Sequence, residues 1–310
     1  FTLANPYRVV IDLPQVTFAL PAGTGDSGRG LVKAFRFGLV MKGGSRIVID
    51  ARKPVRIDKS FVLDAAYGQP ARLVLDLVAT DRESFMRTLA QENKSRPPER
   101  KVVSAAPQAS SDPRPLIVVD PGHGGIDTGT KGHNGQIEEK TIVLEFALLL
   151  RDQLEKSGKY RVAMTRTDDS FIALGDRVEF ARERNAALFV SLHADYLSRK
   201  EGDAQGATVY TLSENASDAE APQLADAENK ADIIAGIDLS NEPSDVADIL
   251  VDLARRETKN FSHQFARGLV SEMRSSIRVH QHPLKSAGFR VLRAPDVPSV
   301  LVELGYVSNK

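Results

Sequence analysis

Two histidines stand where a folded chain would place reactive groups. His123 directly follows an apolar strand pattern in the segment DPGHGG, and His193 ends another such pattern in VSLHAD. Ligands and reactive groups collect at the ends of strands in an α/β sheet, so we expect the two imidazoles to meet. The glycines beside His123 allow a close approach of the backbone to an ion or a substrate. We interpret the remaining histidines as ordinary surface or capping groups: His133, His263, His280 and His282.

Carboxylates at two further places could complete a metal site with these histidines. The chain has no cysteine, so thiolate ligands are excluded and a metal ion would depend on His and Asp/Glu. Glu138 and Glu139 open an expected helix in NGQIEEKTIVLEF, and the residues alone do not choose between them. Glu303 lies in the otherwise apolar pattern SVLVELGYVSN. A buried carboxylate there needs a compensating partner, and proximity to a metal ion is the usual reason to keep one.

Two other kinds of catalytic site are excluded by the same segments. PGHGGIDTG is rich in glycine but lacks both the GK[ST] ending of a P-loop and the spaced glycines of a dinucleotide site. Ser191, His193 and Asp195 alternate along one strand face, so they point the same way and cannot form a nucleophile-base-acid relay. No GxSxG elbow is present either.

The elements that must position these residues follow Pro115. Short apolar strands alternate there with helical stretches, which predicts an α/β domain over residues 116–310 with a mixed, mostly parallel sheet flanked by helices. Residues 1–88 show alternating β-branched runs and turns, which predict a small all-β domain. Residues 89–115 are rich in Pro, Ser and charge, which predicts a flexible linker. The expected elements of the α/β domain are strands at 116–119, 160–164, 188–192, 208–212, 289–292 and 300–303, and helices at 140–156, 176–185 and 259–275.

Composition narrows the possible partners and locations. The chain has 310 residues, with 41 Lys and Arg against 41 Asp and Glu, so bulk positive charge cannot drive binding to nucleic acid. The longest apolar stretches, Ile142–Leu150 and Ser299–Leu304, are too short to span a bilayer. The chain begins at Phe1 without a basic and apolar leader, as expected of a processed or trimmed chain.

One block differs from the alternating strands and helices of the rest of the α/β domain. Residues 214–257 contain 12 Asp and Glu against 3 Lys and Arg. The block includes a capping-box pattern from Ser217 to Glu220 and an amphipathic run with Val246 and Leu253 on one face. We therefore expect an ordered, acidic, helical insertion, with a solvated acidic face as the alternative.

These motifs together resemble the zinc-dependent N-acetylmuramoyl-L-alanine amidases of the Amidase_3 type. The matching stretches are IVVDPGHGGIDTGT, NGQIEEKTIVLEFA, VAMTRTDD, ALFVSLHAD, GATVYTLS and SVLVELGYVSN. The front domain, with NPYRVVIDLP and SRIVIDARKPV, resembles the AMIN domain that accompanies such enzymes. The resemblance implies hydrolysis of the amide bond between N-acetylmuramic acid and L-alanine in peptidoglycan.

The resemblance also implies roles for individual residues. It places one zinc ion on His123, Glu139 and His193, and it makes Glu303 the catalytic acid/base. Glu139 is preferred to Glu138 because the family's ligand precedes a lysine, here Lys140. The acidic block resembles a regulatory insertion that holds some of these enzymes inactive until an activator protein displaces it. Candidate carboxylates for blocking the zinc ion are Glu228 and Glu242.

Domain order and insertion resemble Gram-negative cell-division amidases, which implies export to the periplasm and action in wall remodelling and daughter-cell separation. Two other functions remain open at this point. One is a non-catalytic scaffold that binds peptidoglycan, and the other is a zinc peptidase that cuts within the stem peptide.

Overall fold

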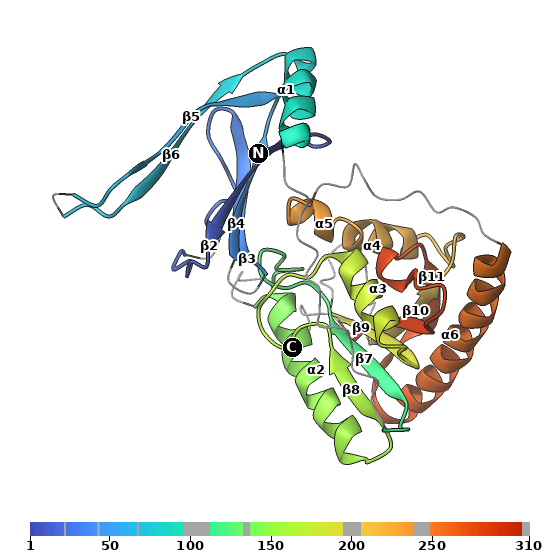
Figure 1. The fold of residues 1–310 in the computed structure, drawn as a ribbon. Helices are drawn as coiled ribbons and strands as arrows, with labels where there is room; N and C mark the ends of the chain where they lie inside the picture. Colours follow the sequence, from blue (N-terminus) through green and yellow to red (C-terminus); the bar gives the residue numbers. More distant parts are fainter. Residues whose placement is uncertain are drawn as a thin grey trace. The chain divides into compact units, whose positions relative to one another are not determined.

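A computed structural model describes residues 1–21, 23–41, 44–66, 68–95, 112–132, 137–194, 206–237 and 249–305 (Figure 1). The chain forms two compact units. One consists of residues 1–38 and 43–101, and the other of residues 39–42 and 102–310. Within the described residues, no helix is both long and apolar enough to cross a membrane.

The first unit is built from two small sheets and one helix. Its larger sheet has the order β1-β2-β4-β3, and β5 pairs with β6 in an antiparallel hairpin. Val10 and Val48 pair in register across β2 and β4 and are buried on the same face of this sheet. The elements are β1 (Thr2–Leu3), β2 (Arg8–Pro14), β3 (Val32–Met41), β4 (Gly44–Ala51), β5 (Val55–Leu63), β6 (Arg72–Ala79) and α1 (Arg82–Ser95).

Helix α1 corrects the expected start of the linker. The Ser84 amide at its start donates to the Asp81 carboxylate (2.8 Å), which satisfies a backbone donor in the first turn. Phe85 and Leu89, four residues apart, are buried on one face of the helix. The helix continues to Ser95, so residues 89–95 are helical rather than part of a flexible linker. Most of the expected linker, residues 96–111, lies outside the described residues.

The second unit is the predicted α/β domain. Its six-stranded sheet has the order β11-β10-β12-β9-β7-β8, in which β10 and β12 are antiparallel and the other paired neighbours are parallel. The strands are β7 (Leu116–Pro121), β8 (Arg161–Met164), β9 (Leu188–His193), β10 (Ala207–Leu212), β11 (Val279–Ala287) and β12 (Ser299–Glu303). The helices are α2 (Glu139–Lys156), α3 (Leu174–Glu183), α4 (Ala221–Glu228), α5 (Ala231–Ile234), α6 (Ile249–Ser276) and the 3-10 helix η1 (Arg290–Leu292).

Apolar spacing explains how the long helices pack. Val143 and Ala147 of α2 and Ala266 and Val270 of α6 are buried in one cluster with side chains from the strands. Each pair is four residues apart and therefore shares a helix face. Gly158, with φ of 70°, follows α2 in the left-handed conformation that glycine supplies at helix ends. These two helices cover the sheet that carries the strand-end histidines.

Three local predictions for this unit were wrong. Phe289–Leu292 was expected to be a strand, but its residues 290–292 form η1, and the strand lies just before it as β11. The helix expected at 259–275 begins within the described residues at Ile249, so the end of the acidic block is the start of α6. Ser217 does not cap α4, because its hydroxyl accepts from the Ser286 amide, whereas Asp218 accepts from the Glu220 and Ala221 amides.

Candidate metal centre

The sheet brings the two predicted histidines together. His123 lies in the loop that follows β7, and His193 is the last residue of the neighbouring strand β9. Their rings are buried, with centroids 4.8 Å apart and planes at 75°. His123 Nε2 and His193 Nδ1 are buried, and neither makes a hydrogen bond to any residue that the structure describes. Both nitrogens therefore lie where a shared ligand could bind them.

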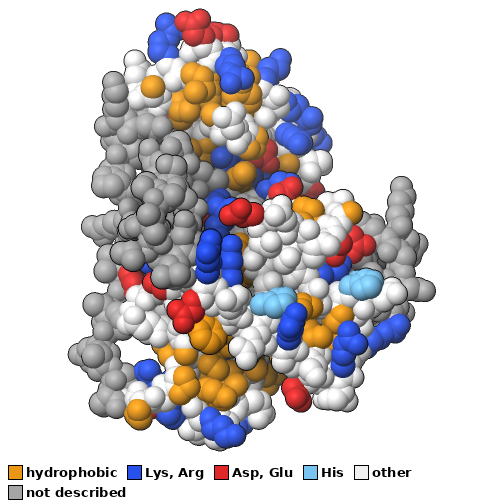
Figure 2. All heavy atoms as spheres, turned by 90° about the vertical axis from the view of Figure 1, so that its right-hand side faces the viewer, with side chains coloured by type: hydrophobic (Ala, Val, Ile, Leu, Met, Phe, Trp, Pro, Cys, Tyr) orange, Lys and Arg blue, Asp and Glu red, His pale blue; other side chains and the backbone are white. Residues whose placement is uncertain are grey.

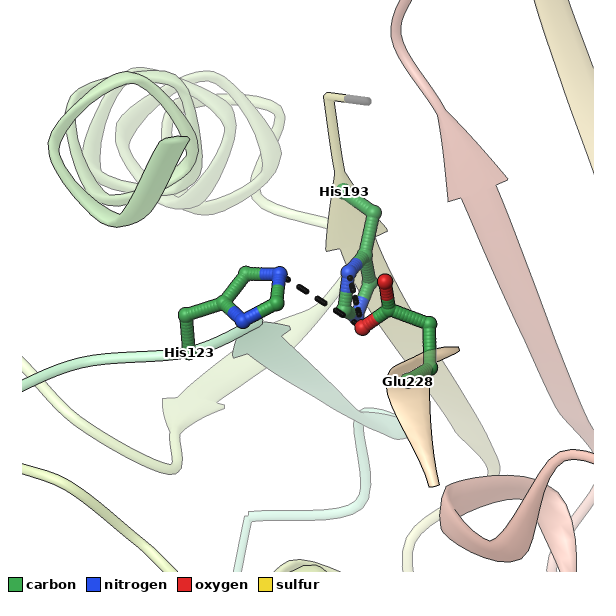
Figure 3. A group of neighbouring side chains, drawn as sticks. All are labelled: His123, His193 and Glu228. Atoms are coloured by element: carbon green, nitrogen blue, oxygen red, sulfur yellow. Dashed lines mark ion pairs between the residues drawn. The ribbon is translucent and has the colours of Figure 1, made fainter. Parts of the chain in front are cut away.

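Two carboxylates face these nitrogens. Glu139, the first residue of α2 and 1% exposed, places Oε1 3.0 Å from His123 Nε2 and 3.4 Å from His193 Nδ1. Glu228, the last residue of α4, places Oε2 3.1 Å from His193 Nδ1 and 3.5 Å from His123 Nε2. Figure 3 shows Glu228 and both imidazoles pointing toward one another. Ligand atoms of His123, His193 and Glu228 lie within 4.8 Å of one another, as in a site that could hold a metal ion.

The two adjacent glutamates at the start of α2 point to different partners. Glu138 lies 3.4 Å from Lys140 Nζ and is partly exposed. Glu139 instead accepts hydrogen bonds from the Ala194 amide at Oε1 and the Thr130 amide at Oε2, each at 2.9 Å. These amides fix the Glu139 carboxylate beside the imidazoles.

An aspartate that the sequence did not single out orients the first histidine. Asp127 Oδ2 lies 2.9 Å from His123 Nδ1, and both side chains are buried. A carboxylate on one ring nitrogen fixes the tautomer and leaves the other nitrogen to bind a metal ion. The Gly129 amide donates to the other oxygen of Asp127 (3.2 Å), which holds the carboxylate in place. The feature of the sequence that could have identified Asp127 is its position four residues after His123 in the same loop.

Glycines make room for the site. A Cβ on Gly122 would lie 2.5 Å from His193 Cε1 and Nε2, closer than real Cβ atoms approach other heavy atoms. A Cβ on Gly129, whose φ is 62°, would lie 2.6 Å from Glu139 Oε2. The glycine-rich sequence after β7 therefore serves close packing around the imidazoles.

The acids give the site a strong preference for positive charge. Burial alone would lower the pKa of both imidazoles, but the carboxylates outweigh it. Glu139, Asp127 and Glu228 hold the pKa of His123 well above its ordinary value. Glu228 and Glu139 raise the pKa of His193 to about 10. The pKa of Glu139 lies well below its usual range despite burial, chiefly because of His123. A cation is thus favoured at the point where these groups converge.

Glu303 lies beside this cluster. It is 4% exposed and pairs in register with His193 across the parallel strands β12 and β9. Residues paired in register point to the same face of a sheet, so Glu303 is the neighbour of His193 on its face. The Leu304 amide donates to the His193 carbonyl (2.8 Å), which ties the ends of the two strands together.

The other candidates of the sequence lie elsewhere. Ser191 donates to the buried carboxylate of Asp120 (2.7 Å), a structural role that agrees with its exclusion as a nucleophile. His263 is exposed on α6, and His280 accepts from the His282 amide on β11 (3.0 Å). Outside the described residues lie His133, Asp195 and Glu242.

Two buried imidazoles at the strand ends of an α/β sheet, with a carboxylate from a neighbouring helix, are a ligand set that metal-dependent hydrolases use. Residues 117–310 match the Amidase_3 model, described as N-acetylmuramoyl-L-alanine amidase, and residues 1–77 match the AMIN domain. The chain belongs to this amidase family, carries an AMIN domain at its front, and is an N-acetylmuramoyl-L-alanine amidase with a His/His/Glu candidate metal site. The family and fold class expected from the motifs are thereby confirmed.

Two relatives are similar to this chain over its whole length. The chain is 33% identical over 326 residues to N-acetylmuramoyl-L-alanine amidase AmiC of Escherichia coli O6:H1, covering 100% of this chain and 76% of the relative. It is 33% identical over 328 residues to AmiC of Neisseria meningitidis serogroup B, with the same coverage. Among solved structures, amidase AmiC2 of Nostoc punctiforme is 28% identical with a TM-score of 0.39, covering 63% of this chain and 82% of that chain.

Proposed function

We propose that this amidase hydrolyses the bond between N-acetylmuramic acid and L-alanine in peptidoglycan with one zinc ion held by His123, Glu139 and His193. The observation that carries this proposal is the pair of buried imidazole nitrogens that make no hydrogen bond within the described residues and face two carboxylates. Leaving buried polar atoms unsatisfied costs stability, so such atoms need an explanation. A metal ion between them supplies it.

The donor set fits zinc. Imidazole nitrogen and carboxylate oxygen are ordinary zinc ligands, and a catalytic zinc site uses three protein ligands with a fourth position for water or substrate. When bound, zinc polarises the amide carbonyl and lowers the pKa of a bound water to about 7. Asp127 supports this use of His123, because it accepts the Nδ1 proton and leaves Nε2 as the nitrogen that can bind the metal ion.

Glu303 is our candidate for the catalytic acid/base. Its register position beside His193 supports this role, since a proton carrier must lie within reach of the attacking water. Glu303 takes a proton from that water as it attacks the amide carbon. It then passes the proton to the alanine nitrogen, which leaves as an amine.

Glu228 is our candidate for an inhibitory contact. Its Oε2 lies 3.1 and 3.5 Å from the two imidazole nitrogens that would hold the metal ion, and a carboxylate there would exclude the attacking water. Three contacts hold its segment against the domain. Lys285 Nζ pairs with Glu220 (2.9 Å), the Asn229 amide group donates to the Gly288 carbonyl (3.0 Å), and the Leu174 amide donates to Asp232 (2.9 Å).

An activator protein that draws α4 away from the site would open the fourth position. The wall-degrading activity and the AMIN domain support a place in the cell envelope. We propose the periplasm as location, with wall remodelling and daughter-cell separation as the process. We propose no nucleic-acid partner, because the chain's charges balance and acidic and basic side chains are interspersed on the face shown in Figure 2.

Product analysis of digested cell walls tests the proposed reaction. Purified peptidoglycan is incubated with the enzyme, and soluble products are identified by mass spectrometry. We expect intact stem peptides with N-terminal L-alanine, together with uncut glycan strands. Shorter peptides would show a peptidase that cuts within the stem. Binding without products, even after zinc is supplied and Glu228 is replaced, would indicate the scaffold instead. Glu303→Ala is the matched inactive control.

A further inference from the structure

Two buried arginines donate hydrogen bonds to the backbone around His123. Arg177 on α3 is 1% exposed and donates to the carbonyls of Pro121 (2.9 Å) and His123 (2.7 Å). Arg166, in the segment after β8, is 4% exposed and donates to the carbonyls of Pro121 (3.0 Å) and Gly122 (2.8 Å). Three consecutive carbonyls, from Pro121 at the end of β7 to His123, therefore accept hydrogen bonds from guanidinium groups of other parts of the chain.

The backbone at this point needs such support. His123 has φ of 58°, a left-handed conformation that is uncommon for residues other than glycine. A residue held in this region carries strain and persists when the surrounding structure fixes it. Arg177 fixes the carbonyl of His123 itself, so it bears directly on the direction of the imidazole.

Arg166 joins this loop to the second ligand-bearing segment. One nitrogen of its guanidinium, Nη2, donates both to the Gly122 carbonyl and to the Lys140 carbonyl, each at 2.8 Å. Lys140 follows Glu139 in the first turn of α2. A single side chain thus links the position of His123 to that of the Glu139 carboxylate.

Burying a charged guanidinium group costs free energy. Burial, and then the charge of Arg177, lower the pKa of Arg166 to about 10. The guanidinium group of Arg166 is therefore charged at neutral pH. The carboxylate of Asp120 compensates the charge of Arg177, from which it accepts a hydrogen bond (2.8 Å). It also accepts hydrogen bonds from the hydroxyls of Thr165 and Ser191. Apolar residues often replace buried ion pairs without loss of stability, so stability alone does not account for this network.

We propose that Arg166 and Arg177 are positioning residues that set the His123 loop and the start of α2 in metal-binding geometry before a metal ion arrives. This inference rests on the zinc site of the proposed function. Their contribution lies in zinc affinity, since their hydrogen bonds with the His123 loop and the start of α2 go to backbone carbonyls. Lysine at either position keeps the charge but cannot reach the same set of carbonyls, because it lacks the planar fork of donors.

Zinc affinity tests the inference on the Arg177→Lys and Arg166→Lys variants of the whole chain. Competition with a chromogenic chelator gives the zinc Kd, and circular dichroism before and after zinc addition gives the folded fraction. We expect the Kd of folded variants to rise about 10- to 100-fold, the usual effect of losing a residue that orients a metal ligand. The matched control is Arg182→Lys. Arg182 lies on α3, as Arg177 does, but it is exposed and pairs with Asp296. The Kd of this control should equal that of the unaltered chain.

Two results would overturn this inference. One is a zinc Kd unchanged in both folded variants while their melting temperature falls, which would mark the arginines as structural. The other comes from the unaltered chain without metal. The amides of Gly124 and Asp127, which bond to each other's carbonyls, should resist hydrogen exchange before zinc is added. Free exchange until zinc arrives would contradict a preset loop, even if the variants fail to fold. Failure of the unaltered chain to bind zinc would instead overturn the proposed function.

Discussion

Replacing Glu228 with alanine should activate the enzyme. The Glu228 side chain is 13% exposed, and its Oε2 contacts both imidazole nitrogens at 3.1 and 3.5 Å. The substitution removes this carboxylate from the position where water must enter. The contacts of Glu220 with Lys285 and of Asp232 with the Leu174 amide remain, so the segment should stay folded.

The size of the activation follows from the contact that is lost. The lost contact is the ion pair between Glu228 and His193, 3.1 Å apart. A close charge pair shielded from water contributes from about 1.5 kcal/mol upward, and each 1.4 kcal/mol changes an equilibrium about tenfold. Losing one such contact should raise the fraction of molecules with an open site about 10- to 100-fold. The rate rises in proportion to that fraction until every molecule is open.

The assay is release of dye-labelled fragments from purified peptidoglycan at matched zinc loading. Asp226→Ala is the control, since Asp226 is exposed on the same helix and its loss changes the net charge equally. The control should keep the basal rate. Glu228→Gln should activate less than alanine, because the amide keeps the shape of the side chain. Loss of both zinc and activity in Glu228→Ala would refute the reasoning and make Glu228 an essential ligand.

Three further predictions concern the site and its support. Gly122→Ala would push the new Cβ to 2.5 Å from His193 Nε2, so zinc affinity measured by chelator competition should fall. Zinc binding at pH 7 should release protons from His123 and His193, whose pKa values are raised, and calorimetry in buffers of different ionisation enthalpy measures this release. Asp120→Asn should cost about 3–5 kcal/mol of unfolding free energy at pH 7, because it leaves Arg177 buried without its counter-charge. Burial raises the pKa of Asp120, but Arg177 and two hydroxyls outweigh it and lower the pKa below 3.8. The stabilising effect of its charge is thus present above pH 3.8 and lost below, so denaturant titrations should show this gap shrink as the pH falls below 3.8.

Strand-end histidines were predictable because their signal is local. An apolar run followed by His123 and glycines, or ended by His193, marks the edge of a sheet without knowledge of the tertiary structure. The burial of Glu303 on a strand was predictable for the same reason, since it is a carboxylate in an otherwise apolar pattern. The strand β11 was missed because Val279–Ala287 carries histidines, a lysine and a proline, which obscure the alternation expected of a strand.

Residues that act through tertiary contacts were not predictable. Arg177 lies on an ordinary amphipathic helix, and its hydrogen bond to the His123 carbonyl depends on how that helix packs. Asp127 lies in a loop, and aspartate is common in loops because it favours turns, so its presence there does not by itself indicate a function. Glu228 was one of two named candidates in an acidic block, and its approach to the imidazoles depends on the fold of that block.

One measurement tests the metal centre most directly. Crystals of the zinc-loaded chain, examined by anomalous scattering at the zinc edge, locate the ion without reference to activity. We predict one zinc ion per chain, in contact with His123 Nε2, His193 Nδ1 and a carboxylate oxygen of Glu139. No anomalous peak between these atoms, with the protein folded and zinc in excess, would contradict the assignment of this cluster as the catalytic metal site.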